Sequence, residues 1–102
     1  MRRYNKPLSV GLAALLAGLL LAACAGPPVQ EMSDARQAIQ AARDAGAEQH
    51  APVPLRQASD YLDSAEIKLQ KRAYNGARKD ARLAREKANQ AMSIAHQSTE
   101  SQ

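Results

Sequence analysis

Alanine recurs at spacings of three and four residues through the last third of the chain, and this pattern limits the folds that the chain can adopt. The positions are Ala77, Ala81, Ala84, Ala88, Ala91 and Ala95. Such spacing places all six side chains on one face of an α-helix, whereas a strand needs a period of two, which the sequence does not show. Small side chains on a buried face also let a second helix approach closely. The sequence therefore predicts an all-α, Ala-rich fold.

A second apolar stripe precedes the alanines and follows a different phase. It consists of Leu55, Ala58, Leu62, Ala65 and Leu69. Continued in the same phase, this stripe would bury Arg72, Gly76 and Lys79, so we expect the helix to end before them. The phase break predicts a turn within residues 71–76 and an antiparallel helical hairpin. The alternative is one long kinked helix over residues 54–97.

A shorter helix is predicted ahead of the hairpin. Ser33 suits the N-cap position and Gly46 suits the stop, which predicts a helix over residues 34–46. Its apolar face holds Ala35, Ala38, Ile39, Ala42 and Ala45. Residues 47–55 contain two prolines and are predicted to be a connection, with Pro54 in the first turn of the next helix. The short helix and the hairpin together make a three-helix unit.

The N-terminus has the pattern of a bacterial secretory signal. Three basic residues at positions 2, 3 and 6 precede an uncharged apolar run over residues 8–23, which ends in small residues before Cys24. The alternative is an uncleaved membrane helix over residues 10–25, which is nearly long enough to cross a bilayer. The many alanines and glycines in the run argue against that alternative.

The four residues Leu21-Ala22-Ala23-Cys24 resemble a lipobox, the modification signal of bacterial lipoproteins. The resemblance implies cleavage between Ala23 and Cys24 and attachment of acyl chains such as palmitate to Cys24, which anchor a mature lipoprotein in a membrane. The next residue is Ala25, where an Asp would tend to retain a lipoprotein in the inner membrane. In a diderm bacterium the resemblance therefore implies the outer membrane, with the protein facing the periplasm.

These features divide the chain into four predicted parts: a signal peptide (1–23), a lipidated tether (24–32), a helical domain (33–97) and a polar tail (98–102). Removing 23 of the 102 residues leaves 79, of which 31 are apolar and 17 of those are Ala. A core with so few large side chains is thin. We therefore expect a contribution to stability from a partner, the membrane or self-association.

Charge is distributed unevenly along the mature chain. Residues 24–67 carry three basic and seven acidic side chains, and residues 68–102 carry eight basic and three acidic ones. Arg78, Arg82 and Arg85 share a helical face away from the alanines, so they are candidates for contact with an anionic surface such as lipid headgroups. The alternative is that acidic helices of the same molecule balance them. Nucleic acid is not an expected partner, because export separates the protein from it.

Nothing in the sequence indicates an enzyme, a cofactor or a metal site. His50 and His96 lie far apart along the chain, which has one cysteine, whereas a metal site usually needs three or four ligands. Asp60, Asp63 and Glu66 share part of one predicted helix, but acid–base chemistry needs a pocket that shifts their pKa values. We expect these carboxylates to form a solvated acidic face.

The run from Glu31 to Ala95 resembles a family of small bacterial lipoproteins whose helical domain is catalogued as a domain of unknown function. The resemblance is carried by Ser33-Asp34-Ala35-Arg36, Ala45-Gly46-Ala47, Pro52, and Tyr74 followed by Ala77. Some members carry an OmpA-type peptidoglycan-binding domain after it. The sequence ends at Gln102 without one, so we expect no peptidoglycan binding by that route. Residues 65–84 are also similar to a single tetratricopeptide repeat.

Two functions fit these features. The first is a periplasm-facing adaptor that binds another envelope protein, with a core packed by Leu55, Leu62, Leu69 and Tyr74. The second is a self-associating structural lipoprotein that resembles the major murein lipoprotein, an Ala-rich coiled coil. The alanine stripe motivates the second function, and the two prolines between the first two predicted helices count against it.

Overall fold

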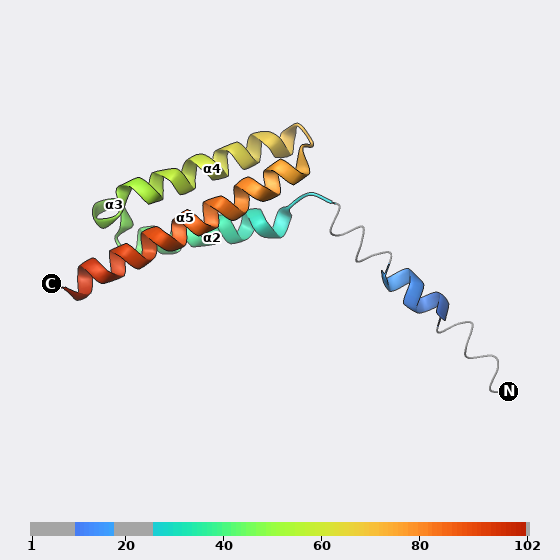
Figure 1. The fold of residues 1–102 in the computed structure, drawn as a ribbon, viewed down its shortest axis with the longest axis horizontal. Helices are drawn as coiled ribbons and strands as arrows, with labels where there is room; N and C mark the ends of the chain where they lie inside the picture. The colour runs from blue at the N-terminus through green and yellow to red at the C-terminus, as the bar shows by residue number, and fades with distance from the viewer. Residues whose placement is uncertain (1–9, 18–25, 102) are drawn as a thin grey trace.

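The computed structural model describes residues 10–17 and 26–101, and the regular elements in these ranges are helices (Figure 1). Apart from a short helix over residues 10–17, they are α2 (Val29–Asp44), α3 (Ala47–His50), α4 (Pro52–Gln70) and α5 (Tyr74–Glu100). The described ranges contain no strand, which confirms the all-α prediction. None of the helices in them is long and apolar enough to cross a membrane.

The helices α4 and α5 form an antiparallel hairpin, and α2 packs against both (Figure 1). α2 runs parallel to α5, because Arg78 contacts Glu31 near the start of both helices and Arg85 contacts Asp34 further along. The structure confirms the predicted short helix and hairpin. The alternative of a single helix over residues 54–97 is wrong.

Alanine makes up most of the core. The six alanines of the α5 stripe have no exposed surface, and they pack where α5 meets α2 and α4. Toward α3 the alanines meet Ile39 and Leu55, and toward the hairpin turn Met32 packs with Ala65 and Ala81. Few large side chains take part, so the helices are held by many small contacts along their length.

The other two predicted stripes also face the core. Their buried members are Ala35, Ile39, Ala42, Leu55, Ala58 and Ala65. Leu62 and Leu69 pack against the core while partly exposed, and Tyr74 is half-buried at the start of α5. Periodicity therefore identified the buried faces of all three long helices.

α2 begins at Val29, earlier than predicted. The amide of Met32 donates to the carbonyl oxygen of Pro28 at 3.0 Å, and both side chains are buried. Ser33, the predicted N-cap, therefore lies inside the helix, and the predicted tether over residues 24–32 is helical from Val29 onward. No side chain caps this helix start, so burial of Pro28 and Met32 is what defines it.

The connection between α2 and α4 contains more helix than predicted. Gly46 ends the first helix as expected, with a φ of 90° that L-residues rarely adopt. The predicted connection over residues 47–55, however, includes the single turn α3 and the first residues of α4. α4 begins at Pro52 rather than at Pro54, since a proline suits the first helical position, where an amide hydrogen has no partner in the helix.

The turn between α4 and α5 is shorter than the predicted residues 71–76. The amide of Ala73 donates to the carbonyl of Lys68 at 2.8 Å, and the amide of Arg72 donates to that of Leu69 at 3.0 Å. This pair of hydrogen bonds is a Schellman motif. Its left-handed position, which glycine normally fills, is occupied by Arg72 with a φ of 60°.

α5 continues to Glu100, so most of the predicted polar tail over residues 98–102 is helical. No glycine or proline follows Gly76 in the sequence to stop the helix. Helix therefore extends into the predicted tether on one side and into the predicted tail on the other.

Ala88→Leu tests the alanine core. Ala88 has no exposed surface, so the added carbons have to displace a neighbouring helix, and we expect the free energy of unfolding to fall by about 1–3 kcal/mol. Ala41→Leu is the matched control, because Ala41 is exposed on α2 and the two residue types have similar helix propensities. Chemical denaturation followed by circular dichroism measures both variants. Equal losses in the two would contradict a close-packed alanine core.

Candidate functional site

An arginine of α5 fastens the start of α2 to the hairpin. The Nη2 of Arg78 donates to the carbonyl oxygen of Gly26 at 2.8 Å, and its Nε lies 3.3 Å from Oε1 of Glu31. Only 16% of the Arg78 side chain is exposed, which strengthens both charge-assisted contacts. We call Gly26, Glu31 and Arg78 the N-terminal clamp. The clamp fixes the backbone two residues after Cys24 to the body of the bundle.

Arg82 and Arg85 continue the same row along α5. The Nη2 of Arg82 lies 4.0 Å from Oε1 of Glu31, and the Nη1 of Arg85 lies 3.7 Å from Oδ2 of Asp34. Both arginines are more than half exposed, so each pair contributes at most about 1 kcal/mol. The face predicted to carry Arg78, Arg82 and Arg85 is thus turned toward acidic residues of α2. Contact of these arginines with an external anionic surface stays a prediction.

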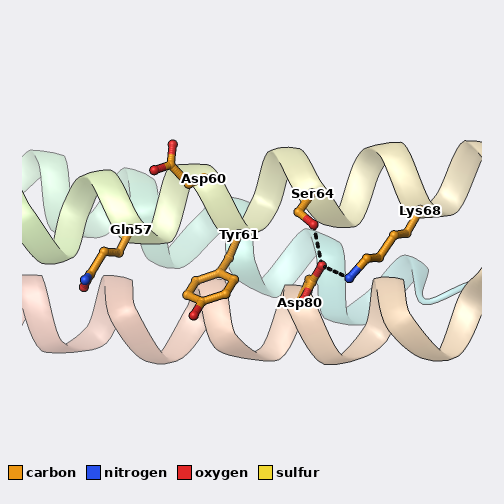
Figure 2. Close-up of a pocket in the computed structure, with 6 residues that line it drawn as sticks. All are labelled: Gln57, Asp60, Tyr61, Ser64, Lys68 and Asp80. Atoms are coloured by element: carbon orange, nitrogen blue, oxygen red, sulfur yellow. Dashed lines mark hydrogen bonds and ion pairs between the residues drawn. The ribbon is translucent and has the colours of Figure 1, made fainter.

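A second polar cluster, which was not predicted, joins α4 to α5 (Figure 2). Oδ2 of Asp80 accepts a hydrogen bond from the Ser64 hydroxyl at 2.6 Å and lies 2.7 Å from Nζ of Lys68. Ser64 and Lys68 are one helical turn apart on α4, so both reach the same carboxylate. Asp80 is only 6% exposed and is the one buried charged residue in the described part of the chain.

The pKa of Asp80 is lowered from its ordinary value. Burial acts to raise it, because a low-dielectric environment disfavours the charged carboxylate. The hydrogen bonds from Lys68 and Ser64, together with the positive charges of Lys68 and Lys79, outweigh burial. Asp80 is therefore ionised at neutral pH.

An open groove of about 500 Å³ lies beside this cluster. It is lined by Gln57, Asp60, Tyr61, Ser64, Lys68 and Asp80 (Figure 2). Asp60 points away from Asp80, and the Ser64 hydroxyl donates to a carboxylate that is already paired with an ammonium group. No imidazole lines the groove to activate that hydroxyl. The geometry supports a structural cross-link between two helices more than a nucleophile and its base.

The sequence carried a signal for this cluster. Asp80 is the one acidic residue among the basic residues of positions 68–85, and it directly precedes Ala81 of the buried stripe. A lone carboxylate among basic residues has partners available. Its burial, however, depends on where α4 crosses α5, which the spacing of residues along one helix does not indicate.

The remaining predicted site residues are not brought together. The predicted cleavage site between Ala23 and Cys24 and the predicted lipidation residue Cys24 lie outside the described residues. His50 is half-buried in α3, and His96 is exposed near the end of α5. In the part of the chain that the structure describes, no group of three His, Cys, Asp or Glu side chains could hold a metal ion.

Asp80→Asn tests the charge of the buried cross-link. At neutral pH we expect the free energy of unfolding to fall by about 1–2 kcal/mol, because the Lys68 ammonium loses its carboxylate partner. A carboxylate whose pKa is lowered by folding stabilises the fold above its unfolded pKa, and this contribution is lost as the pH falls through the folded pKa. The deficit of the variant should therefore be full at about pH 6 and should shrink as the pH falls below 3.8, the ordinary pKa of an aspartate.

Asp63→Asn is the control for this comparison. Asp63 is exposed on α4, the other helix of the hairpin, and forms no ion pair within the described residues, so the variant should match the wild type at both pH values. The measurement is the denaturant midpoint of the wild type and of the two variants, in neutral and in acidic buffer. A deficit of Asp80→Asn that persists unchanged in acid would show that its charge is not what stabilises the hairpin.

Comparison with known families matches residues 30–102 to a domain of unknown function, DUF4398. The match spans α2 to α5 and includes Glu31, Arg78 and the buried Asp80. No curated protein and no solved structure matches the chain. Because the matched region covers well over half of the 102 residues, the chain belongs to the DUF4398 family.

Proposed function

We propose that this protein is a lipoprotein anchored through Cys24, whose three-helix bundle serves as an adaptor for another protein of the cell envelope. The anchor rests on the lipobox-like residues at positions 21–24 and on the basic and apolar segment before them. The adaptor role rests on two features of the bundle. Its helices expose surfaces that a partner can bind, and its groove contains the Lys68–Asp80 ion pair, which suits a structural cross-link more than catalysis.

The N-terminal clamp is the observation that carries the anchor. Only Ala25 separates Cys24 from Gly26, whose carbonyl is bound by Arg78. Cleavage before Cys24 leaves the whole clamp and α2 in place, because the packing of the bundle involves residues from Gly26 onward. A cysteine at the border between an export signal and a folded domain is where a lipid anchor is expected.

The burial of the alanines favours an adaptor over self-association. A structural lipoprotein that self-associates through the α5 stripe needs those alanines to be exposed. In the bundle the six alanines have no exposed surface, because α5 packs against α2 and α4. α4 instead exposes Val53 and Ile67, fourteen residues apart, a spacing that returns nearly to the same face of a helix. The outer face of α4 is therefore the favoured surface for a partner.

The residue after the cysteine indicates which of the two membranes holds the anchor. Ala25 stands where an Asp would tend to retain a lipoprotein in the inner membrane. The proposal therefore places the protein in the inner leaflet of the outer membrane of a diderm bacterium, facing the periplasm.

Cys24→Ser tests the lipid anchor. In cells supplied with labelled palmitate, we expect the wild-type protein to carry the label and the variant to show only background, because serine has no thiol to form the thioether. The variant should also keep its N-terminal 23 residues, which mass spectrometry of the purified protein detects. Labelling or cleavage of Cys24→Ser would overturn the proposed anchor.

Two variants of the next residue provide controls. Ala25→Ser should be labelled and located as the wild type, because it leaves the cysteine and the clamp unchanged. Ala25→Asp should also be labelled but should move to the inner-membrane fraction of a density gradient. An Ala25→Asp protein that stays with the outer membrane would contradict the proposed location without affecting the anchor.

A further inference from the structure

We propose that the hairpin turn of the bundle docks on anionic phospholipid headgroups of the membrane that holds the anchor. We call Lys71, Arg72 and Lys79 the basic tip. This inference rests on the proposed lipidation of Cys24 and adds to it a defined orientation of the bundle on the bilayer.

The position of the anchor directs this end of the bundle toward the membrane. The start of α2 and the turn between α4 and α5 lie at the same end (Figure 1), where Arg78 binds the carbonyl of Gly26 at 2.8 Å. Gly26 follows Cys24 by two residues, and two residues span at most about 7 Å. Pro28 is buried directly after the clamp, which leaves little slack in the chain. A lipid on Cys24 therefore keeps the turn close to the headgroups.

The charges at this end differ in whether they form ion pairs within the bundle. Lys68 is paired with Asp80, and Arg78 is paired with Glu31. The residues of the basic tip are exposed and form no ion pair within the described part of the chain. Three positive charges thus remain for an external anion at the end that lies nearest to the bilayer.

The backbone at Arg72 gives a second, independent observation. Its φ of 60° places an arginine in a left-handed conformation that glycine adopts without strain. The exposed side chain makes no hydrogen bond or ion pair in the described residues to compensate for this strain. A residue in a strained conformation whose side chain has no partner in the described residues indicates a role outside the bundle, and an exposed guanidinium in the turn suits phosphate binding.

One exposed apolar side chain supports the assignment to a bilayer. Val29, the first residue of α2, is 71% exposed at the same end of the bundle. Exposed apolar side chains beside basic ones are typical of protein surfaces that dock in the headgroup region. A peptidoglycan strand offers charge but no apolar layer, whereas a bilayer offers charged headgroups above an apolar layer, so the bilayer is the partner that fits both features.

This docking orients the bundle with its long axis pointing away from the membrane surface. α5 has 27 residues and is therefore about 40 Å long, running from the tip to the opposite end of the bundle. Its C-terminal half is carried away from the bilayer, together with α3, where a periplasmic partner has free access.

Fluorescence transfer to a membrane dye tests the orientation. The lipidated protein is reconstituted in vesicles of phosphatidylcholine, with or without phosphatidylglycerol, and carries one probe at Gln70→Cys or at Gln97→Cys. Cys24 is the sole native cysteine and its sulfur is occupied by lipid, so each introduced thiol is labelled alone. With phosphatidylglycerol we expect strong transfer from position 70, at the end of α4, and weak transfer from position 97. High salt or neutral vesicles should reduce this contrast.

Two sets of variants separate docking from folding and from net charge. Arg72→Gly should raise the melting temperature by roughly 4–8 °C while weakening docking, so a loss of docking cannot come from unfolding. Lys71→Gln combined with Arg72→Gly should lower the ratio of docked to undocked protein by roughly 25-fold, from a factor of about five for each basic residue. Arg56→Gln combined with Lys87→Gln removes the same charge away from the tip and should leave docking unchanged.

The outcomes distinguish the two proposals. Failure of the purified protein to incorporate into any vesicle overturns the lipid anchor, and the docking falls with it. Incorporation with equal transfer from positions 70 and 97, or equal losses in the tip and control variants, overturns the docking alone. Docking that requires added peptidoglycan fragments in place of phosphatidylglycerol would also overturn it, because the tip would then bind another polyanion.

Discussion

The close approach of helices that alanine permits is the constraint on which the rest of this bundle depends. α5 presents six alanines without exposed surface where it meets α2 and α4. Each buried methyl contributes roughly 0.8 kcal/mol, so stability has to be collected over the whole 27-residue helix and not from a few large side chains. The same close packing leaves no space for a larger side chain at these six positions. A helix whose buried side chains are this small therefore has to be long to be stable.

Polar cross-links complete what alanine packing leaves open. Alanine side chains are small and alike, so a helix face made of them packs almost equally well in several positions. Alanine packing alone therefore specifies the relative positions of two helices weakly. Asp80 binds Ser64 and Lys68 at short range and so defines how α4 meets α5. Arg78 does the same for α2, through Glu31 and the carbonyl of Gly26. Asp80 and Arg78, the central residues of the two cross-links, are themselves largely shielded from water, which strengthens their charge-assisted hydrogen bonds.

Much of the fold follows from local patterns. Helical spacing identified the buried faces, the phase break after the second stripe predicted the hairpin, and Gly46 ended the first helix where expected. The errors share one cause. α2 starts at Val29 because Met32 is covered by α4 and α5, and the single turn α3 forms because Ala47 is covered by α5. Burial by a segment that is distant in the sequence cannot be read from the local residues that it stabilises. Prediction from capping residues therefore made these helices too short.

By itself, the sequence determined that the chain is helical and which faces of the helices are buried, because periodicity and composition act over neighbouring residues. Only the tertiary structure decided which charged residues serve the fold and which remain outside it. Arg78 and Arg72 are both basic residues near one turn, yet Arg78 is largely shielded within the N-terminal clamp, whereas Arg72 is exposed in the basic tip with a strained backbone. The difference arises because α2 lies along one side of α5, a placement set by long-range packing and not by the residues around either arginine.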